Sequence, residues 1–228
     1  MGKSVSVIIP AYNEEKNIEE AIASCFTVLP ALCADFEVIA VNDGSVDKTG
    51  DVAEALKSRF VGLKVYHHPF NQGMGQAIRT GIFQAEKELI FTTCADLQFD
   101  IKELENLLAL IDGADMVIGS RKIRYDSSYR RVCTFIYHLL LKLLFGLRFA
   151  DPTWVKLFKK SIYDKIAFSS QGFFWEAEIL VNARRNNYLI KEAEVYSRPR
   201  KAGKSSGANP LKHLEIIREM LVFRMNNN

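Results

Sequence analysis

Cysteine is scarce in this sequence, and its spacing does not suggest metal or disulfide chemistry. The four cysteines among the 228 residues form no C-x-x-C pair and have no histidine at a zinc-ligand spacing. This pattern is typical neither of a zinc site nor of the dense cysteine framework of a small disulfide-stabilised domain. We therefore expect reduced thiols in a cytosolic protein.

Long apolar runs, repeats and a strong net charge are missing as well. No apolar stretch reaches the roughly 18 residues of a membrane-spanning helix, and the first residues lead into a strand pattern without a secretory signal. The net charge of +3 gives no reason to expect nucleic-acid binding. What is present is an ordinary globular composition, 48% hydrophobic and 25% charged, with enough apolar residues for a sizeable core.

Strand and helix patterns alternate through the first 120 residues. The expected strands are residues 5–9, 36–41, 63–66, 89–91 and 116–119. Helical patterns run between them, the first from residue 14 to about residue 28. This alternation predicts one α/β domain, residues 1–228, with a mostly parallel central sheet flanked by helices.

Polar residues stand where the expected strands end. After the strand at 89–91 come Asp96 and Gln98, two oxygen-bearing side chains two residues apart. Ligands of α/β proteins bind at the carboxyl ends of strands, and such oxygens suit Mg²⁺ or Mn²⁺ with phosphates as further ligands. A polar turn without a ligand explains the stretch equally well. Residues 10–14 and 43–45 end two other strands at the same edge, so we expect the three loops to converge.

The second half has a different character. It begins with a basic loop, residues 121–131, and continues as a strongly apolar helix over residues 132–147. Either this helix covers the core, or it lies in a membrane interface with Arg130, Arg131, Lys142 and Arg148 facing headgroups. The remaining elements expected are a strand at 156–158, a helix through 181, a strand at 188–195, a mobile basic loop at 199–210 and an amphipathic helix at 211–223.

An ordered set of motifs carries a resemblance to a known family. The set is Ile8-Ile9-Pro10-Ala11-Tyr12-Asn13-Glu14, Val41-Asn42-Asp43-Gly44-Ser45-x-Asp47-x-Thr49, Ala95-Asp96-Leu97-Gln98, Gly119-Ser120-Arg121, Asp151-Pro152-Thr153, Gly172-Phe173 with Glu178, and Arg200-x-x-Gly203-x-Ser205. It resembles family 2 glycosyltransferases of the GT-A (Rossmann-like) fold, and among them the dolichyl-phosphate mannose synthases and related polyprenyl-phosphate hexosyltransferases. The likeness covers nearly the whole chain.

The resemblance implies a nucleotide-sugar-binding half, residues 1–120, and an acceptor-side half, residues 121–228. The implied nucleotide-sugar site consists of Pro10, Ala11, Tyr12, Glu14, Val41, Asp43, Cys94, Ala95, Asp96, Gln98 and Arg121. Within it, Asp96 and Gln98 would hold the metal. The implied acceptor side consists of Arg130, Asp151, Glu178, Arg200, Lys204 and Ser205. The implied catalytic residues are Asp96, Arg121, Arg130 and Arg200, since guanidinium groups match phosphate oxygens.

The implied reaction is an inverting transfer of a hexose, mannose or glucose, from a GDP- or UDP-sugar to polyprenyl or dolichyl phosphate. That acceptor is already anionic, so positioning and charge neutralisation suffice. A sugar hydroxyl would need a carboxylate base, either Glu178 or Asp151. The implied location is the cytoplasmic face of a membrane, with peripheral contact and a membrane protein as a further partner to consider.

Three positions depart from the family pattern. Cys94 stands where the metal motif has its first aspartate, and a thiol is a poor ligand for Mg²⁺, so we expect weaker metal binding. Ser206 stands where a lysine is usual, and Trp154-Val155-Lys156 replaces Ser-Gly-Phe. Two rival interpretations therefore stay open: a soluble transferase that adds a sugar to a glycan hydroxyl, and a nucleotide-sugar-binding relative that has lost its chemistry.

Overall fold

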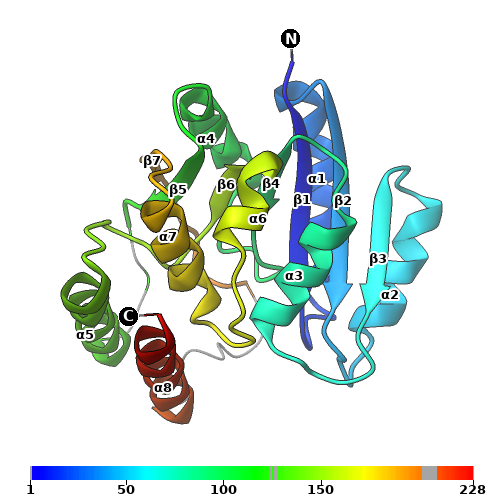
Figure 1. Cartoon of the computed structure of the whole chain (residues 1–228). Helices are drawn as coiled ribbons and strands as arrows, with labels where there is room; N and C mark the ends of the chain where they lie inside the picture. The colour runs from blue at the N-terminus through cyan, green and yellow to red at the C-terminus, as the bar shows by residue number, and fades with distance from the viewer. Residues whose placement is uncertain (1, 124, 126–127, 202–209, 228) are drawn as a thin grey trace.

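A central sheet organises the computed structural model, which describes residues 2–123, 125, 128–201 and 210–227 (Figure 1). Within these residues the sheet has seven strands in the order β3-β2-β1-β4-β6-β5-β7. The strands are β1 (Ser4–Ala11), β2 (Asp35–Asn42), β3 (Leu63–His67), β4 (Leu89–Thr92), β5 (Met116–Arg121), β6 (Lys156–Lys159) and β7 (Ile190–Val195).

The sheet is mostly parallel, as predicted. β1 pairs in parallel with β2 and β4, β2 with β3, and β5 with β7. The exception is β6, which lies antiparallel between β4 and β5. Because the first five strands run in one direction, the loops that follow them meet at one edge of the sheet, which we call the carboxyl-end edge.

Helices cover both faces of the sheet. They are α1 (Ile18–Leu32), α2 (Thr49–Ala55), α3 (Met74–Gln84), α4 (Leu104–Ile111), α5 (Ser128–Phe145), α6 (Tyr163–Ile166), α7 (Trp175–Arg185) and α8 (Pro210–Asn226). Two hydrophobic clusters result, one with α1, α2 and α4, the other with α3 and α5 to α8. β1 serves both clusters, because neighbouring side chains of a strand alternate: Val7 and Ile9 pack on the first cluster and Ile8 on the second.

The first helix begins and ends later than predicted. Its first residue is Ile18, and Glu14 lies in a turn whose carbonyl accepts hydrogen bonds from the N–H groups of Asn17 and Ile18, both at 2.9 Å. Asn13, with φ of 55°, reverses the chain before this turn. The helix continues to Leu32 because Leu29 still faces the core. The acidic residues of its first turn are therefore Glu19 and Glu20.

Helix α5 covers the core with one face, where Tyr137, Leu140, Leu144 and Phe145 pack on the second cluster, and leaves its other face open. Of its side chains only Leu141 is buried. One face carries exposed apolar side chains at helical spacing, namely Val132, Phe135, Ile136, Leu139 and Leu143. The opposite side packs beside α8, with the Phe145 and Phe223 rings 5.8 Å apart (Figure 1). No helix in the described part of the chain is long and apolar enough to cross a membrane.

Helix α8 is less amphipathic than predicted. Met220 and Phe223 are buried, but Leu221, Val222 and Met225 are exposed. Apolar side chains therefore lie on both its covered and its open sides. The basic loop expected at 199–210 falls largely outside the described residues.

Close packing between β1 and α3 gives a test of this arrangement. A Cβ at Gly81 would lie inside contact distance of the Ile8 Cγ2 atom in the core. We expect Gly81→Ala to lower the free energy of unfolding by about 1–3 kcal/mol in urea titrations, because overpacking outweighs the gain in helix propensity. Gly113→Ala is the control, since its Cβ would meet the flexible tip of Lys191, and it should be nearly neutral. A Gly81→Ala protein as stable as the parent would contradict this packing.

Candidate functional site

Two loops interlock where β1 and β2 end. The ends are level, with Ala11 opposite Asn42 in the parallel register. The Asn13 N–H donates to Ser45 Oγ at 3.0 Å, and the Glu14 N–H donates to Thr49 Oγ1 at 2.8 Å. The side chains of the second motif thus fix the backbone of the first, so the motif residues Ser45 and Thr49 have a structural role.

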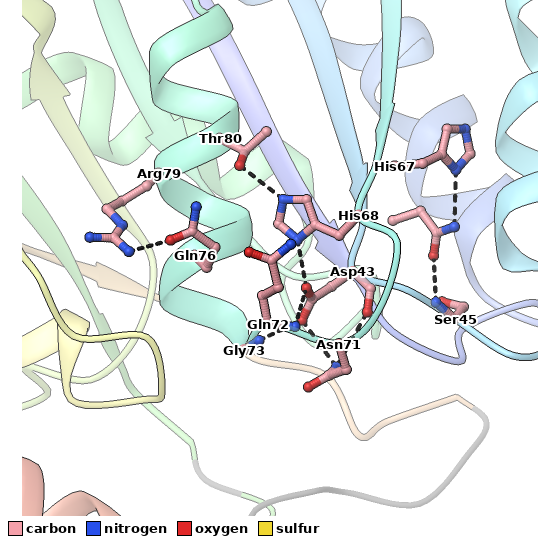
Figure 2. A network of polar contacts seen from close by, with 11 residues as sticks. Asp43, Ser45, His67, His68, Asn71, Gln72, Gly73, Gln76, Arg79 and Thr80 are labelled. Carbon is pink, nitrogen blue, oxygen red and sulfur yellow. Dashed lines mark hydrogen bonds and ion pairs between the residues drawn. The ribbon is translucent and has the colours of Figure 1, made fainter.

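Asp43 is the centre of a polar network at this edge (Figure 2). Its Oδ1 lies 2.7 Å from His68 Nδ1 and accepts from the Gln72 N–H at 2.9 Å. Its Oδ2 accepts from Asn71 Nδ2 at 3.0 Å and from the Gly73 N–H at 2.9 Å. Because an ionised carboxylate only accepts, the Nδ1 of His68 must carry the proton. Four donors therefore fill a carboxylate whose side chain is only 4% exposed.

The expectation that Asp43 binds the base remains a prediction, and this network constrains how it could do so. With four donors in place, a base N–H group has to displace one of them to reach the carboxylate. In the structure, Asp43 holds residues 68–73 and so positions the start of α3. His68 and Asn71 belong to this network but were not among the predicted site residues. The only sequence signal for them was the Asn71-Gln72-Gly73 turn, which Asn71 begins and which follows His68 closely.

The other residues predicted to hold the base and ribose differ in exposure. Pro10 and Ala11 are buried at the end of β1, and Val41 is buried in the second hydrophobic cluster. Their side chains are covered, so they can offer a ligand only backbone groups. Tyr12 is 45% exposed, and its ring is accessible for stacking on a base.

Charged side chains from distant segments meet at the carboxyl-end edge. Arg200 Nη1 lies 3.4 Å from Asp96 Oδ2, and Arg200 Nη2 pairs with Glu14 Oε1. Arg121 makes a two-pronged pair with Asp151, Nε to Oδ2 at 2.6 Å and Nη2 to Oδ1 at 3.0 Å. We call the set the charge cluster. Its members are Glu14, Asp96, Arg121, Arg130, Asp151, Lys156, Glu176 and Arg200.

Asp96 is largely buried, with a side chain that is 17% exposed. Burial raises its pKa, while the Gln98 N–H and the positive charges of Arg200, Arg130 and Arg121 act in the opposite direction. The structure thus brings the four predicted catalytic residues within electrostatic reach of one another. Glu14, expected near the base, instead contacts Arg200. Its Oε2 accepts from Asn17 Nδ2 at 2.6 Å.

The donor set at Asp96 is small. Burial, with the negative charge of Asp96, raises the pKa of the Cys94 thiol well above its usual range, so it stays protonated and is a poor metal ligand. Ala95 is buried beside it. No group of three or more His, Cys, Asp or Glu side chains suited to a metal occurs within the described residues. Asp96 and the Gln98 amide remain the residues predicted to hold Mg²⁺ or Mn²⁺, and with so few protein donors such an ion would take most of its ligands from a diphosphate.

The two carboxylates expected to act as a base are otherwise engaged. Glu178 is buried, with Oε1 accepting from the Ser169 N–H at 2.8 Å and Oε2 from the Ser170 N–H at 2.9 Å. It anchors the loop before α7, and Gly75 at the start of α3 donates its N–H to that loop at Gln171 O, 2.7 Å away. Asp151 is held by Arg121.

Glu176 lies on α7 two residues before Glu178 and was not among the predicted site residues. Burial raises its pKa to about 7, against the positive charges of Lys156 and Arg121. Its carboxylate accepts none of the hydrogen bonds found among the described residues. Lys156 is fully buried, donates to Trp154 O at 2.8 Å and has a lowered pKa through burial. In the sequence, the signals for Glu176 and Lys156 were an acid directly after Phe173-Phe174-Trp175 and a lysine at the start of an apolar strand.

Two predicted acceptor-side residues remain without a structural account. Lys204 and Ser205 lie outside the described residues. So does Ser206, which departs from the family pattern. Arg130 lies in the first turn of α5, partly exposed. A surface hollow at the opposite edge of the sheet is lined by charges that pair with each other, Lys64 with Glu37 at 2.7 Å and Lys87 with Asp35 at 2.6 Å. That hollow does not compete with the charge cluster as a site for phosphate chemistry.

Comparisons with known proteins found a matching family and relatives that cover most of this chain. The model of the family Glycosyl transferase family 2 matches residues 6–175. Glycosyltransferase AglD of Haloferax volcanii is 28% identical over 210 residues, which cover 87% of this chain and 34% of AglD. Dolichyl-phosphate beta-glucosyltransferase ALG5D of Trichomonas vaginalis is 26% identical over 244 residues, which cover 97% of this chain and 74% of that protein. This chain thus spans about a third of the first relative.

Solved structures share the fold. Glucosyl-3-phosphoglycerate synthase from Mycobacterium tuberculosis, in complex with Mn²⁺, UDP and phosphoglyceric acid, superposes with a TM-score of 0.77 at 19% identity, over 97% of this chain and 78% of that one. The same enzyme with Mg²⁺ and UDP gives a TM-score of 0.73 at 19% identity, over 96% and 79%. The predicted GT-A fold is thereby confirmed.

The Asp43 network predicts a graded loss of stability. Asp43→Asn turns an NH₂ group toward donors that then lack an acceptor, so we expect the free energy of unfolding to fall by about 3 kcal/mol. Asn71→Ala removes a single donor and should cost about 1–2 kcal/mol. Urea unfolding followed by circular dichroism checks both values. Equal stability of Asp43→Asn and the parent would show that the network does not hold this edge together.

Proposed function

This chain belongs to glycosyltransferase family 2, and from that premise we propose that it transfers a hexose from a nucleotide diphosphate sugar to a polyprenyl phosphate. One observation carries the proposal. α5 carries Arg130 in its first turn, within electrostatic reach of Asp96, and continues as a helix with an exposed apolar face. Guanidinium groups beside an apolar surface match an acceptor with a phosphate head and a hydrocarbon tail.

The comparisons favour glucose over mannose as the sugar. The Trichomonas relative is a dolichyl-phosphate beta-glucosyltransferase, and the mycobacterial structures hold UDP. Although the motifs resemble mannose synthases as well, UDP-glucose is the donor that we propose first. Tyr12 would stack on the base, and backbone groups of Pro10, Ala11 and Val41 would surround it.

The proposed mechanism needs little acid–base chemistry. An oxygen of the lipid phosphate attacks the anomeric carbon, the bond from that carbon to the diphosphate oxygen breaks, and the configuration inverts. Arg121 and Arg200 neutralise the departing diphosphate, and Arg130 orients the acceptor. A Mg²⁺ or Mn²⁺ ion held by Asp96 and Gln98 would supply further charge neutralisation. Loss of one such contact typically costs about 3 kcal/mol of transition-state stabilisation, or ~100-fold in rate.

Peripheral contact with a membrane is part of this proposal. The exposed apolar face of α5 is flanked by Arg131, Lys142 and Arg148, which are exposed. Leu221 and Val222 of α8 are exposed beside them. Apolar side chains with basic flanks favour the interface of an anionic bilayer.

A second acceptor class is favoured by one specific observation. Glu176 is a half-buried residue whose carboxyl group is poorly solvated, which raises its pKa to about 7, and the carboxylate accepts none of the hydrogen bonds found among the described residues. A general base works best with a pKa near the working pH. If the acceptor is a sugar hydroxyl, Glu176 is the residue that would take its proton, in place of Glu178 or Asp151.

The reaction is tested with radiolabelled UDP-glucose, GDP-mannose and UDP-GlcNAc, each with a polyprenyl phosphate and Mg²⁺ or Mn²⁺. We expect label in the organic phase from UDP-glucose. Glu176→Gln should change that rate by less than about threefold, because a phosphate acceptor needs no base. A drop of about 100-fold or more would contradict the phosphate acceptor and support the hydroxyl. Glu178→Gln is the structural control, expected to lower the melting temperature as its loop loses its anchor.

Membrane contact is tested by sedimentation with vesicles that contain anionic lipid. Phe135→Ser combined with Leu139→Ser should lower the affinity for the vesicles by about tenfold or more, because two apolar side chains no longer enter the bilayer. Phe83→Ser removes an exposed apolar side chain from α3 and should have no effect. Salt should weaken binding of the parent protein through screening of its basic flank. Parent protein that stays in the supernatant would refute the membrane contact.

A further inference from the structure

A short segment after β7 crosses the carboxyl-end edge and is tied down on both sides of Asp96. We call residues 196–201 the strap. Ser197 pairs with Phe99 in an antiparallel bridge, and the Arg198 N–H donates to Gln98 O at 2.8 Å. At the far end Lys201 pairs with Glu20 of α1. The strap therefore spans from the metal-motif loop to the first helix, and Arg200 is placed between these two attachments.

Arg200 acts as the cation between two carboxylates. Its guanidinium contacts Glu14 with one nitrogen and Asp96 with the other, and the three side chains are 13–19% exposed. Asp96 Oδ1 already accepts from the Gln98 N–H at 3.1 Å, and Oδ2 faces Arg200. The donor set expected for a divalent cation is thus neutralised by a side chain of the protein. Cys94, in place of a second acid, leaves no further carboxylate in the motif.

We propose that Arg200 is a built-in competitor of the metal, which keeps free divalent cations away from Asp96 until a nucleotide diphosphate draws the guanidinium to its own oxygens. The inference rests on the proposed function and deepens it, because it makes metal and nucleotide bind as a coupled pair. A divalent ion on Asp96 and the guanidinium of Arg200 repel each other at close range in a poorly hydrated place. A diphosphate removes that conflict, since it offers a two-pronged acceptor to Arg200 and releases Asp96 to the ion.

Glu14 is a positioning residue in this account. It holds one side of the guanidinium in the unliganded protein, and its second oxygen is fixed by Asn17. Removal of Arg200 leaves Glu14 and Asp96 facing one vacated position. Two carboxylates without a cation between them bind a divalent ion more tightly than one carboxylate that is already paired.

The test is a titration of the full chain with Mn²⁺, followed by electron paramagnetic resonance of the free ion, without and with UDP. We expect Arg200→Gln to bind Mn²⁺ alone about tenfold more tightly or better than the parent protein. UDP should raise the Mn²⁺ affinity of the parent strongly and that of Arg200→Gln much less. Arg198→Gln is the matched control, because this strap arginine pairs with Asp100 and is 62% exposed, and it should behave as the parent.

Each outcome decides the inference. Adding Asp96→Asn to Arg200→Gln should abolish the gained affinity, and a gain that survives it would place the ion elsewhere and overturn the proposal. Equal Mn²⁺ affinities of the parent and Arg200→Gln in the absence of UDP would also overturn it. The proposed function fails separately, if neither UDP nor GDP binds to the parent protein. The titration without nucleotide still tests Arg200 in that case.

Discussion

The mutual neutralisation of largely buried carboxylates and guanidinium groups at one edge of the sheet is the interaction on which the rest of the site depends. Arg200 bridges Glu14 and Asp96, and Arg121 grips Asp151. These pairs join the loop after β1, the loop after β4, the end of β5 and the segment after β7. Because these charges are poorly hydrated, each needs a partner of opposite charge. Removal of one side chain therefore leaves another charge unpaired. In the mechanism that we propose, a diphosphate enters by exchange of partners.

A second polar centre lies beside the first and has a different task. Asp43 uses all of its acceptor capacity on residues 68–73, and the side chains of Ser45 and Thr49 hold the loop after β1. The motif that looks like a ligand-binding sequence therefore builds the frame of the site. The contacts that we propose for a nucleotide come from Tyr12, from exposed backbone and from the charge cluster. Rigid loops of this kind reduce the entropy lost when a ligand binds.

The acceptor side combines two chemistries on neighbouring elements. α5 carries Arg130 at the charge cluster and apolar residues along its open face, while α7 carries Glu176 facing Lys156 and Arg121. The first arrangement fits a lipid phosphate and the second a hydroxyl. Family membership alone does not choose between them, because the same sheet supports both acceptor types through different side chains at its edge.

The sequence by itself determined the sheet, its direction and the edge where the loops meet. The spacing of apolar residues and the polar residues at the strand ends are local signals that can be read along the chain. It also marked Asp96 and the three arginines that gather around it. Only the tertiary structure decided which of the two glutamates on α7 already has hydrogen-bond partners. Glu176 and Glu178 differ by two positions on one helix, yet one anchors a loop and the other faces the charge cluster. It likewise decided that Asp43 is saturated and that Arg200 is paired with Glu14, 186 residues away in the chain. Hydrogen-bond partners so distant in sequence leave no local pattern, because only the folded sheet brings them together.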